Sequence, residues 1–426
     1  MKRRDLIKAG VVAGAAAALS AQAQSAQANQ PGILTRARNL IFFAYDGMGW
    51  EDYAIAQFYS RRVLGKPLAL ERFLATGVSG LQNTNSLTSF VTESSAASNA
   101  WSTGVKTVNG GLAIHVDGRK LTPIFALAKQ QGKAVGLVST ATITHATPAG
   151  FVISNPDRNA EDQIAEQYLE FGAEVYLGGG QRFFDPAVRR DKKDLYAAYA
   201  AKGYGVVKNL RELEASNASK LLGVFSSSHI PYEADRRFQG VDTPSLAQMT
   251  RAALPRLAAS SKGFVLQVEA ARIDHANHLN DPAGSLWDIL AADEALEVVM
   301  NFVDQNPDTL LIIGSDHVCG APALYGTGSS YRESSAGVLM LENQKGTFEF
   351  MLGRLGNNPS PEQVVEIFRT VKGVTLKPEQ AQVVVDAITQ RVYQPDAVRY
   401  GVQPANTLSW VMRQTDARKP DLPNIG

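Results

Sequence analysis

The chain has 426 residues, of which 45% are hydrophobic and 19% charged, and its formal net charge is +1. This composition is typical of a globular protein and excludes a collagen-like or largely disordered chain. A net charge so close to zero argues against a broad basic face for nucleic acid and against membrane recruitment by charge. With Cys319 as its single cysteine, the chain has no disulfide within itself.

Residues 1–28 are expected to be an export signal and not part of the fold. Basic residues at 2–4 precede an alanine-rich apolar run at 9–19, and residues 21–23 or 26–28 offer an A-x-A cleavage site. The run is too short to span a membrane well, so no membrane span is expected after signal removal. The pair Arg3-Arg4 indicates a twin-arginine signal, with an ordinary secretory signal as the alternative. The expected location is the periplasm or the outside of the cell.

Five short, continuous apolar runs are expected to be buried strands. They lack the alternation of a half-exposed strand and have the length of strands covered on both faces. Helical patterns lie between them, for example at residues 160–171 and 287–303. This alternation predicts an α/β fold with a mostly parallel central sheet sandwiched between helices. The runs are residues 39–45, 134–138, 174–177, 264–268 and 309–313.

One catalytic domain is expected over residues 33–426, with a peripheral insertion at about 325–400. Within the insertion, Ser360-Pro361 and Lys377-Pro378 have proline in the first turn, which is typical of helix starts. A loop-rich stretch is expected around residues 325–335.

Three of the predicted strands end in residues that can bind cations. Asp46 follows the first run, Glu269 the fourth, and the pair Asp316-His317 the fifth. In open sheets of this class, ligands bind at the carboxyl ends of the strands. A single acid in such a position is usually a turn or cap residue, but three such ends predict a metal site.

Asp274 and His278 add a second indication of metal binding. They are four residues apart, so on a helix they lie on one face. A carboxylate and an imidazole at this spacing can bind one zinc ion, and Glu269 can reach a second, harder cation. The alternative is a polar pair on a solvated helix face.

A candidate nucleophile, Ser94, lies in a stretch of small residues at 91–107. If a helix starts there, its free amide groups and positive dipole end favour an anion. Serine- and alanine-rich helix starts are common, so this stretch alone indicates little.

Five motifs together resemble the alkaline phosphatase family in order and spacing, over about residues 38–320. The resemblance implies that family's fold and a hydrolase of small-molecule phosphate monoesters with a broad substrate range. The motifs are Asp46-Gly47-Met48-Gly49, Glu93-Ser94 with Trp101–Thr107, Thr144-His145 with Thr147, Glu269 with Asp274 and His278, and Ser315-Asp316-His317.

The resemblance also implies roles for individual residues. Ser94 would be the nucleophile and form a phosphoserine, and Arg158 would hold the phosphate. Two Zn²⁺ and one Mg²⁺ are expected as cofactors. One zinc would bind Asp274 and His278, the other Asp46, Asp316 and His317, and the magnesium would bind Asp46, Thr147 and Glu269 with His145 beside it.

Other positions are less typical of the family or of a binding role. Glu93 stands where the family usually has the aspartate that helps to position the arginine. Ser95 is the alternative nucleophile, although it breaks the seven-residue step from Ser94 to Trp101. Four further residues have less specific expectations. His115 and His229 are expected to be surface or structural residues, and His275 to lie beside the metal ligands or pack on its helix. Cys319 is expected to be a buried small residue, with metal contact as the less favoured alternative.

The family's last zinc ligand, a histidine near the C-terminus, has no counterpart here, because all six histidines lie at or before position 317. The chain is therefore expected to be truncated at its C-terminus or altered at that site, with weak metal binding. Two alternatives stay open: a phosphodiesterase of the same superfamily, and an inactive metal-binding exported protein. A sulfatase is excluded, since the residues after Ser94 lack a C/S-x-P-x-R pattern. A homodimer is compatible with the family.

Overall fold

The computed structural model describes residues 37–320, 322, 335–389, 407–408 and 411–412. The described fold belongs to one compact unit that begins at Arg38. The expected export signal at 1–28 lies outside the described residues. So do residues 325–334, where a loop-rich stretch is expected.

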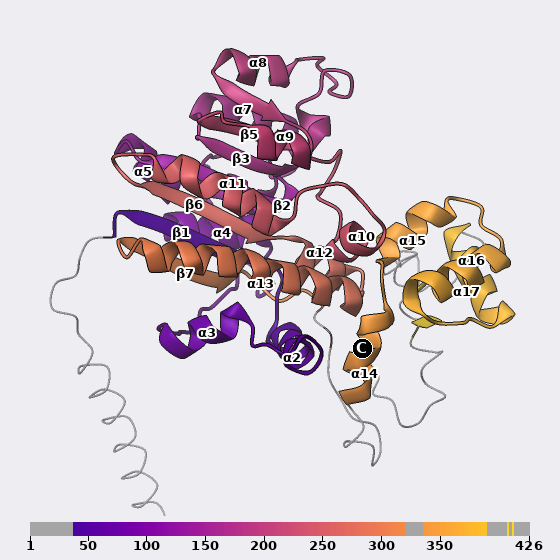
Figure 1. Ribbon diagram of the computed structural model, residues 1–426. Coiled ribbons are helices and arrows are strands. Elements are labelled where there is room, and N and C mark those ends of the chain that lie inside the picture. The colour runs from indigo at the N-terminus through magenta and orange to yellow at the C-terminus, as the bar shows by residue number, and fades with distance from the viewer. Residues whose placement is uncertain (1–36, 321, 323–334, 390–406, 409–410, 413–426) are drawn as a thin grey trace, which may run out of the picture. The chain divides into compact units, whose positions relative to one another are not determined.

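A seven-stranded sheet forms the centre of this unit, in the order β4-β5-β3-β2-β6-β1-β7, and every pairing between these strands is parallel (Figure 1). The parallel α/β fold is therefore confirmed. The strands are β1 (Asn39–Tyr45), β2 (Ala134–Thr142), β3 (Val175–Gly179), β4 (Tyr204–Val207), β5 (Lys220–Val224), β6 (Phe264–Ala270) and β7 (Thr309–Ser315).

The register of the central strands brings their polar ends to one edge of the sheet. Tyr45 at the end of β1 pairs with Ala270 of β6 and Ser315 of β7. Asp46 and Asp316 therefore lie one residue beyond this paired row of residues, and Glu269 lies one residue before it. Ser139 of β2 pairs with Glu269 and joins them.

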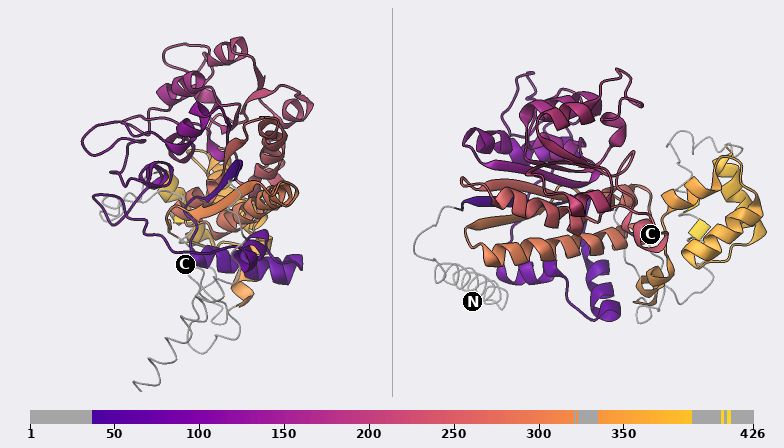
Figure 2. Two further views of the ribbon diagram at one scale, coloured as in Figure 1. Left: turned by 90° about the vertical axis from the view of Figure 1, so that its left-hand side faces the viewer. Right: turned by 45° about the horizontal axis from the view of Figure 1, so that its top comes forward.

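Helices cover both faces of the sheet (Figures 1 and 2). Successive strand residues point to opposite faces, so Ile41 and Phe43 belong to one hydrophobic core and Phe42 and Ala44 to the other. Both faces of the strand are buried, which is why its sequence reads as a continuous apolar run. The first core includes side chains from α2 (Trp50–Tyr59), α3 (Ala69–Thr76), α9 (Leu210–Ala215), α10 (Glu233–Phe238), α11 (Leu246–Ala258), α12 (Arg272–His278), α13 (Pro282–Gln305) and α14 (Ser335–Met340). The second core includes side chains from α5 (Ile124–Gln130), α6 (Ala146–Gly150), α7 (Glu161–Phe171) and α8 (Leu195–Ala201), together with Trp101 of α4 (Ser94–Thr103).

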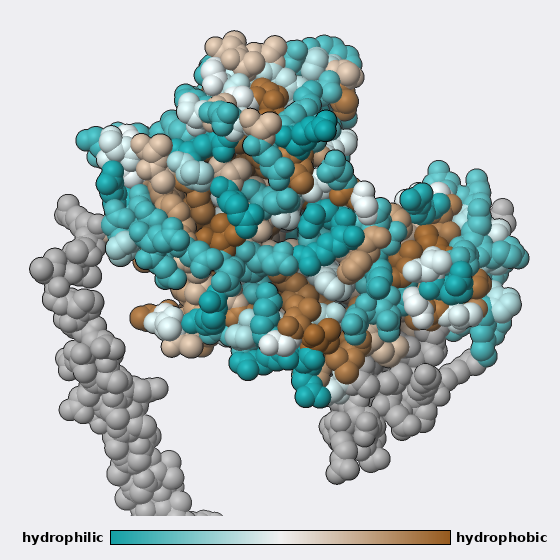
Figure 3. All heavy atoms as spheres, viewed as in Figure 1, coloured by the Kyte–Doolittle hydropathy of each residue, from teal (hydrophilic) through white to brown (hydrophobic). Residues whose placement is uncertain are grey.

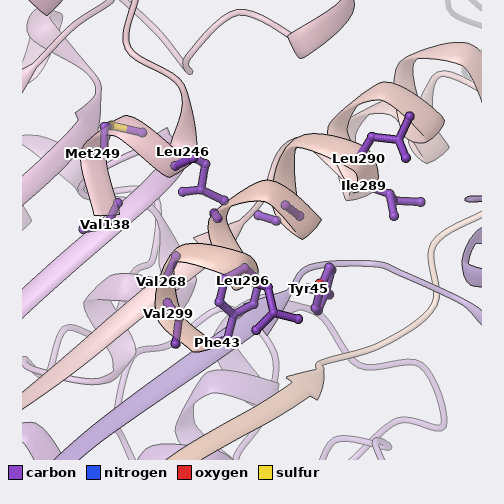
Figure 4. Close-up of a cluster of buried hydrophobic side chains, with 14 of the residues drawn as sticks. Phe43, Tyr45, Val138, Leu246, Met249, Val268, Ile289, Leu290, Leu296 and Val299 are labelled. Atoms are coloured by element: carbon purple, nitrogen blue, oxygen red, sulfur yellow. The ribbon is translucent and has the colours of Figure 1, made fainter. Parts of the chain in front are cut away.

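Figure 4 shows part of the first core, where α11 and α13 pack over the sheet. Leu296 and Val299 of α13 lie beside Phe43 of β1 and Val268 of β6. All four side chains are fully buried. The burial of each side chain contributes roughly 1.5–3 kcal/mol to the stability of the fold. This core holds in place the strands whose ends bear the polar residues.

The strand predictions differ from the structure in three respects. Strands β4 and β5 were not predicted from the sequence, because they are short and lie among polar and glycine residues. Strand β2 continues four residues past the predicted end, to Thr142. On the outer strand β7, which was expected to be covered on both faces, Leu310 and Ile312 are 49% and 39% exposed.

A third, smaller hydrophobic cluster lies mostly within the region expected as a peripheral insertion. It is formed by α15 (Phe348–Leu355), α16 (Pro361–Ile367) and α17 (Pro378–Ile388), together with residues 408, 411 and 412. Helices α16 and α17 begin at the prolines from which helix starts were predicted. Ser360 caps α16 by accepting a hydrogen bond from the backbone N–H of Gln363.

These three helices, called the α15–α17 helices below, are held to the sheet-bearing part by buried polar contacts. Lys372 Nζ lies 2.9 Å and 3.1 Å from the two carboxylate oxygens of Asp281, and both side chains are at most 1% exposed. The same carboxylate accepts a hydrogen bond from the backbone N–H of Phe348 at 2.7 Å. Asp281 also caps α13, so one buried acid connects α13 to the α15–α17 helices.

On the face shown in Figure 3, hydrophilic side chains predominate, and hydrophobic ones gather near α14 and on the α15–α17 helices. Among the described residues, no helix is both long and apolar enough to cross a membrane.

Candidate metal centre and nucleophile

Asp46, Asp316 and His317 lie together where β1 and β7 end. One ligand atom from each lies within 4.8 Å of the other two. His317 Nε2 is 3.3 Å from Asp316 Oδ2 and 3.7 Å from Asp46 Oδ1. The backbone N–H of Gly47 donates to Asp316 Oδ1 at 3.0 Å, which ties the two strand ends together.

Asp46 also belongs to a second group, with His145 and Glu269, whose ligand atoms again lie within 4.8 Å of one another. Thr147 Oγ1 donates to Asp46 Oδ2 at 3.4 Å. Ser139 Oγ donates to Glu269 Oε2 from the neighbouring strand. Asp46 is thus shared by two groups of potential ligands.

Asp274 and His278 lie together on α12, with His278 Nε2 3.4 Å from Asp274 Oδ2. Cys319 completes a third group with them. Gly47 allows α12 to come so close to the end of β1, because a Cβ at this residue would lie 2.7 Å from the Cα of Asp274. Its φ of +69° also favours glycine.

These groups have the chemistry of cation sites. Among the described residues, several buried oxygen and nitrogen atoms of these groups have no hydrogen-bond partner, an arrangement that is costly unless a cation or water satisfies them. Four of the residues are carboxylates, which suit magnesium, and the imidazoles suit zinc. The unpartnered atoms are Asp46 Oδ1, Glu269 Oε1, Asp274 Oδ1, Asp316 Oδ2, His317 Nε2 and His145 Nδ1.

The electrostatics agree with a need for positive charge. Burial, and then the charges of Asp316, Asp274 and Glu269, raise the pKa of Asp46 well above its usual value. Burial raises the pKa of Glu269 to about 7 and also raises the pKa of Asp316. Bound cations would balance these charges, so the residues fit the metal ions that the sequence predicts.

Ser94 is the first residue of α4 and is 4% exposed. Glu93 caps this helix by accepting hydrogen bonds from the backbone N–H groups of Ser95 and Ala96, each at 3.0 Å. The Ser95 hydroxyl is fully buried, donates to Glu93 and accepts from the N–H of Gly110 at 3.1 Å. Of the two neighbouring serines, Ser95 therefore serves the structure around Glu93.

Arg158 connects the start of α4 to the polar strand ends. Its Nη1 forms an ion pair with Glu93, and its Nη2 lies 3.1 Å from His145 Nε2. Burial alone would raise the pKa of Glu93, but the charge of Arg158 and the hydrogen bonds from Ser95 and Gly110 outweigh burial and lower this pKa to about 2. Burial, and then the charge of Arg158, lower the pKa of His145 well below its usual value.

Two further imidazoles flank His145, and the sequence did not predict that His229 would be one of them. The rings of His229 and His275 each lie 5.7 Å from the His145 ring, and His229 Nδ1 accepts a hydrogen bond from the N–H of Thr142. His229 is thus a structural residue of the site and not a surface one. Arg272 Nη1 lies 2.8 Å from His275 Nδ1, and Arg272 Nη2 donates to both carboxylate oxygens of Glu349. No motif marks His229, since only the fold brings the β5–α10 loop to the end of β2.

The chain resembles known proteins over most of its length. A model of the alkaline phosphatase family matches residues 37–390. Alkaline phosphatase 3 of Bacillus subtilis is 30% identical over 375 residues, which are 85% of this chain and 78% of the relative. The crystal structure of Thermus thermophilus alkaline phosphatase is 67% identical, with a TM-score of 0.89 over 93% of this chain and 84% of that one.

A third likeness, at 24% identity, concerns the fold. The mutant alkaline phosphatase of the Antarctic bacterium TAB5, solved with Mg bound in its M3 site, has a TM-score of 0.62 and covers 70% of this chain and 83% of its own. The match over residues 37–390 is long enough to identify the protein: this chain belongs to the alkaline phosphatase family, a family of metal-dependent phosphate monoester hydrolases.

Proposed function

We propose that the chain hydrolyses phosphate monoesters through a phosphoserine at Ser94. The observation that carries the proposal is the connection from Ser94 to the metal centre. Glu93, directly before Ser94, pairs with Arg158, and Arg158 contacts His145 of the group that includes Asp46 and Glu269. A nucleophile, a phosphate-binding cation and a cluster of cation ligands are thereby linked in one site.

In the first step, the Ser94 oxygen attacks phosphorus and the bond between phosphorus and the alcohol oxygen breaks. The serine hydroxyl gives its proton to solvent, and the departing alcohol takes one up from solvent. The planar guanidinium of Arg158 can hold two phosphate oxygens at once. The positive end of the α4 helix dipole adds attraction for the same oxygens. Water then attacks the phosphoserine, inorganic phosphate leaves, and the Ser94 hydroxyl is restored. The reaction depends mainly on positioning and charge, which these residues supply.

Two Zn²⁺ ions and one Mg²⁺ ion are the proposed cofactors. Bound in this site, the cations would activate the serine hydroxyl and water and balance the charge of the phosphate. Within the chain, we assign Asp274 and His278 to one zinc and Asp316 and His317 to the other, with Asp46 shared between that zinc and the magnesium. Glu269 and Thr147 would complete the magnesium site with His145 beside it.

A comparison of two substrates tests this function. The purified full chain, supplied with Zn²⁺ and Mg²⁺, should hydrolyse p-nitrophenyl phosphate and leave bis(p-nitrophenyl) phosphate nearly untouched. Preferred turnover of the diester would instead support the phosphodiesterase alternative, which the comparisons do not favour. Stoichiometric metal binding without turnover of either ester would support the inactive alternative and contradict the proposal.

We infer further that the protein is exported to the periplasm or beyond, by the twin-arginine route, and that it acts as a homodimer. Replacement of Arg3 and Arg4 by lysine should leave the protein inside the cell. Light scattering of the metal-loaded protein should give about twice the mass of one chain. Unchanged export of the lysine variant would contradict the first inference, and a monomeric mass the second.

A further inference from the structure

Cys319 lies in a group with two residues proposed to bind zinc. One ligand atom each from Cys319, Asp274 and His278 lies within 4.8 Å of the other two. Asp274 is 95% buried, since its exposed fraction is 5%, and its Oδ1 has no hydrogen-bond partner among the described residues. His278 approaches from the solvent side, with 66% of its side chain exposed. The thiol thus meets a buried, unsatisfied carboxylate oxygen and an imidazole.

The backbone holds Cys319 in this position. Its N–H donates to the carbonyl of Gly47 at 3.2 Å. The same carbonyl accepts a hydrogen bond from Asn277 Nδ2, also at 3.2 Å, and Asn277 lies on α12 between the two zinc residues. One carbonyl oxygen therefore fixes the thiol segment and the ligand helix relative to each other.

The next residue brings the segment still closer to α12. Gly320 has a φ of +50°, and a Cβ at this position would lie 2.9 Å from the carbonyl oxygen of Asn277. Only glycine fits this approach without a shift of the backbone. The thiol is thus placed by its neighbours on both sides, which distinguishes it from a cysteine that happens to lie near an acid.

We propose that the sulfur of Cys319 is a ligand of the cation that Asp274 and His278 bind. The inference rests on the metal-dependent function proposed above and adds a ligand to it. Carboxylate, imidazole and thiolate together make a three-residue set that suits zinc and leaves a fourth position open. When the metal binds, the thiol would give its proton to solvent and the thiolate would coordinate the cation. Metal binding should therefore release a proton from this residue.

Cobalt spectroscopy tests the sulfur ligand directly. The full chain is stripped with a chelator and titrated with Co²⁺. A near-ultraviolet charge-transfer band from thiolate to cobalt should grow to saturation. Cys319 is the chain's single cysteine, so the band can have no other protein source. Cys319→Ser should lack the band, and Asp274→Ala should lose or weaken it. Val318→Ala, a change at an exposed neighbour, should keep it.

The reactivity of the thiol in the unmutated protein gives a readout independent of any variant. Zn²⁺ should slow the reaction of Cys319 with a disulfide reagent by at least about tenfold, and Cys319→Ser should weaken zinc binding at this site by a similar factor. Cobalt absorption without the charge-transfer band, equal thiol reactivity with and without zinc, or a band that survives intact in Asp274→Ala would each overturn the proposal.

The two proposals fail separately. A protein that hydrolyses phosphate monoesters and binds cobalt without the charge-transfer band refutes the sulfur ligand and leaves the proposed function in place. A protein that shows the band but has no monoesterase activity supports the sulfur ligand and refutes the proposed function.

Discussion

The guanidinium of Arg158 is paired with Glu93, the residue that directly precedes Ser94. The Glu93 carboxylate also caps α4 and accepts the N–H of Gly110 at 3.0 Å. A glutamate at this position can therefore cap the helix and reach the arginine together, although its side chain is one methylene longer than that of the aspartate usual in the family. The position of Arg158, the proposed phosphate-binding residue, thus depends on the same carboxylate that orders the start of the helix that bears Ser94.

The Glu93 contacts predict a pH-dependent loss of stability in Glu93→Gln. The folded-state pKa is lowered to about 2, so the ionised carboxylate stabilises the fold above its ordinary pKa, and this contribution disappears as the pH falls from about 4.5 towards 2. At pH 7 the free energy of unfolding of the variant should be lower by on the order of 2 kcal/mol. The difference from the unmutated protein should shrink below pH 4.5. Urea unfolding across this range measures it, with Glu170→Gln on an exposed face as control. A constant difference at all pH values would contradict the assignment.

Arg158→Lys should preserve the charge and impair phosphate binding. A lysine lacks the planar fork, so it cannot hold two phosphate oxygens in the same way or pair with Glu93 as closely. We expect kcat/KM for a monoester to fall about 10- to 100-fold, the equivalent of one hydrogen bond to a charged group. Inhibition by inorganic phosphate should weaken as well. Arg119→Lys, on an exposed turn, is the matched control and should change neither quantity. Equal phosphate inhibition in Arg158→Lys would argue against the assigned role.

Strand ends and helix spacing explain which parts of the site the sequence predicts. Asp46, Glu269 and Asp316 follow apolar runs that form parallel strands, so their convergence follows from the fold class. His229 could not be predicted in the same way, since a loop after a short strand brings it to Thr142 and His145. The extension of β2 past Val138 has a comparable cause. Its polar residues are buried because they find partners, as Thr140 Oγ1 does in the N–H of Ala271 at 2.8 Å.

Metal removal should destabilise the protein more at pH 8 than at pH 5. Without cations, burial raises the folded-state pKa of Glu269 to about 7. For a carboxyl group with a raised pKa, the folded state retains a proton that the unfolded chain has lost. Stability therefore falls as the pH rises from about 4.5 to 7. Cations balance the charge that the lost proton leaves behind.

The melting temperatures of chelated and metal-loaded protein, measured from pH 5 to pH 8, check this expectation. The difference between the two melting temperatures should increase with pH and disappear when Zn²⁺ and Mg²⁺ are added back to the chelated protein. Glu269→Gln should reduce the pH dependence of the chelated protein, because one buried charge is removed. A gap that narrows towards pH 8 would contradict the account.

Lys372→Met should show how much the buried ion pair contributes to stability. The change leaves Asp281 as a buried acid without its cation, which is expected to cost about 3–5 kcal/mol. Asp281→Asn in the same chain should recover part of the loss. Arg369→Met breaks the exposed pair with Glu366 and serves as control, with a much smaller expected loss of stability because solvent screens this pair. Equal unfolding free energies for Lys372→Met and Arg369→Met would refute the distinction.

The identity of the phosphorylated residue tests the central claim most directly. The protein is mixed with a ³²P-labelled monoester, quenched with acid and digested, and fragment masses locate the phosphate. The account predicts label on Ser94, its loss in Ser94→Ala together with at least a ~10³-fold fall in kcat, and its retention in Ser95→Ala. Label on Ser95, or turnover in Ser94→Ala at the level of the unmutated protein, would contradict it.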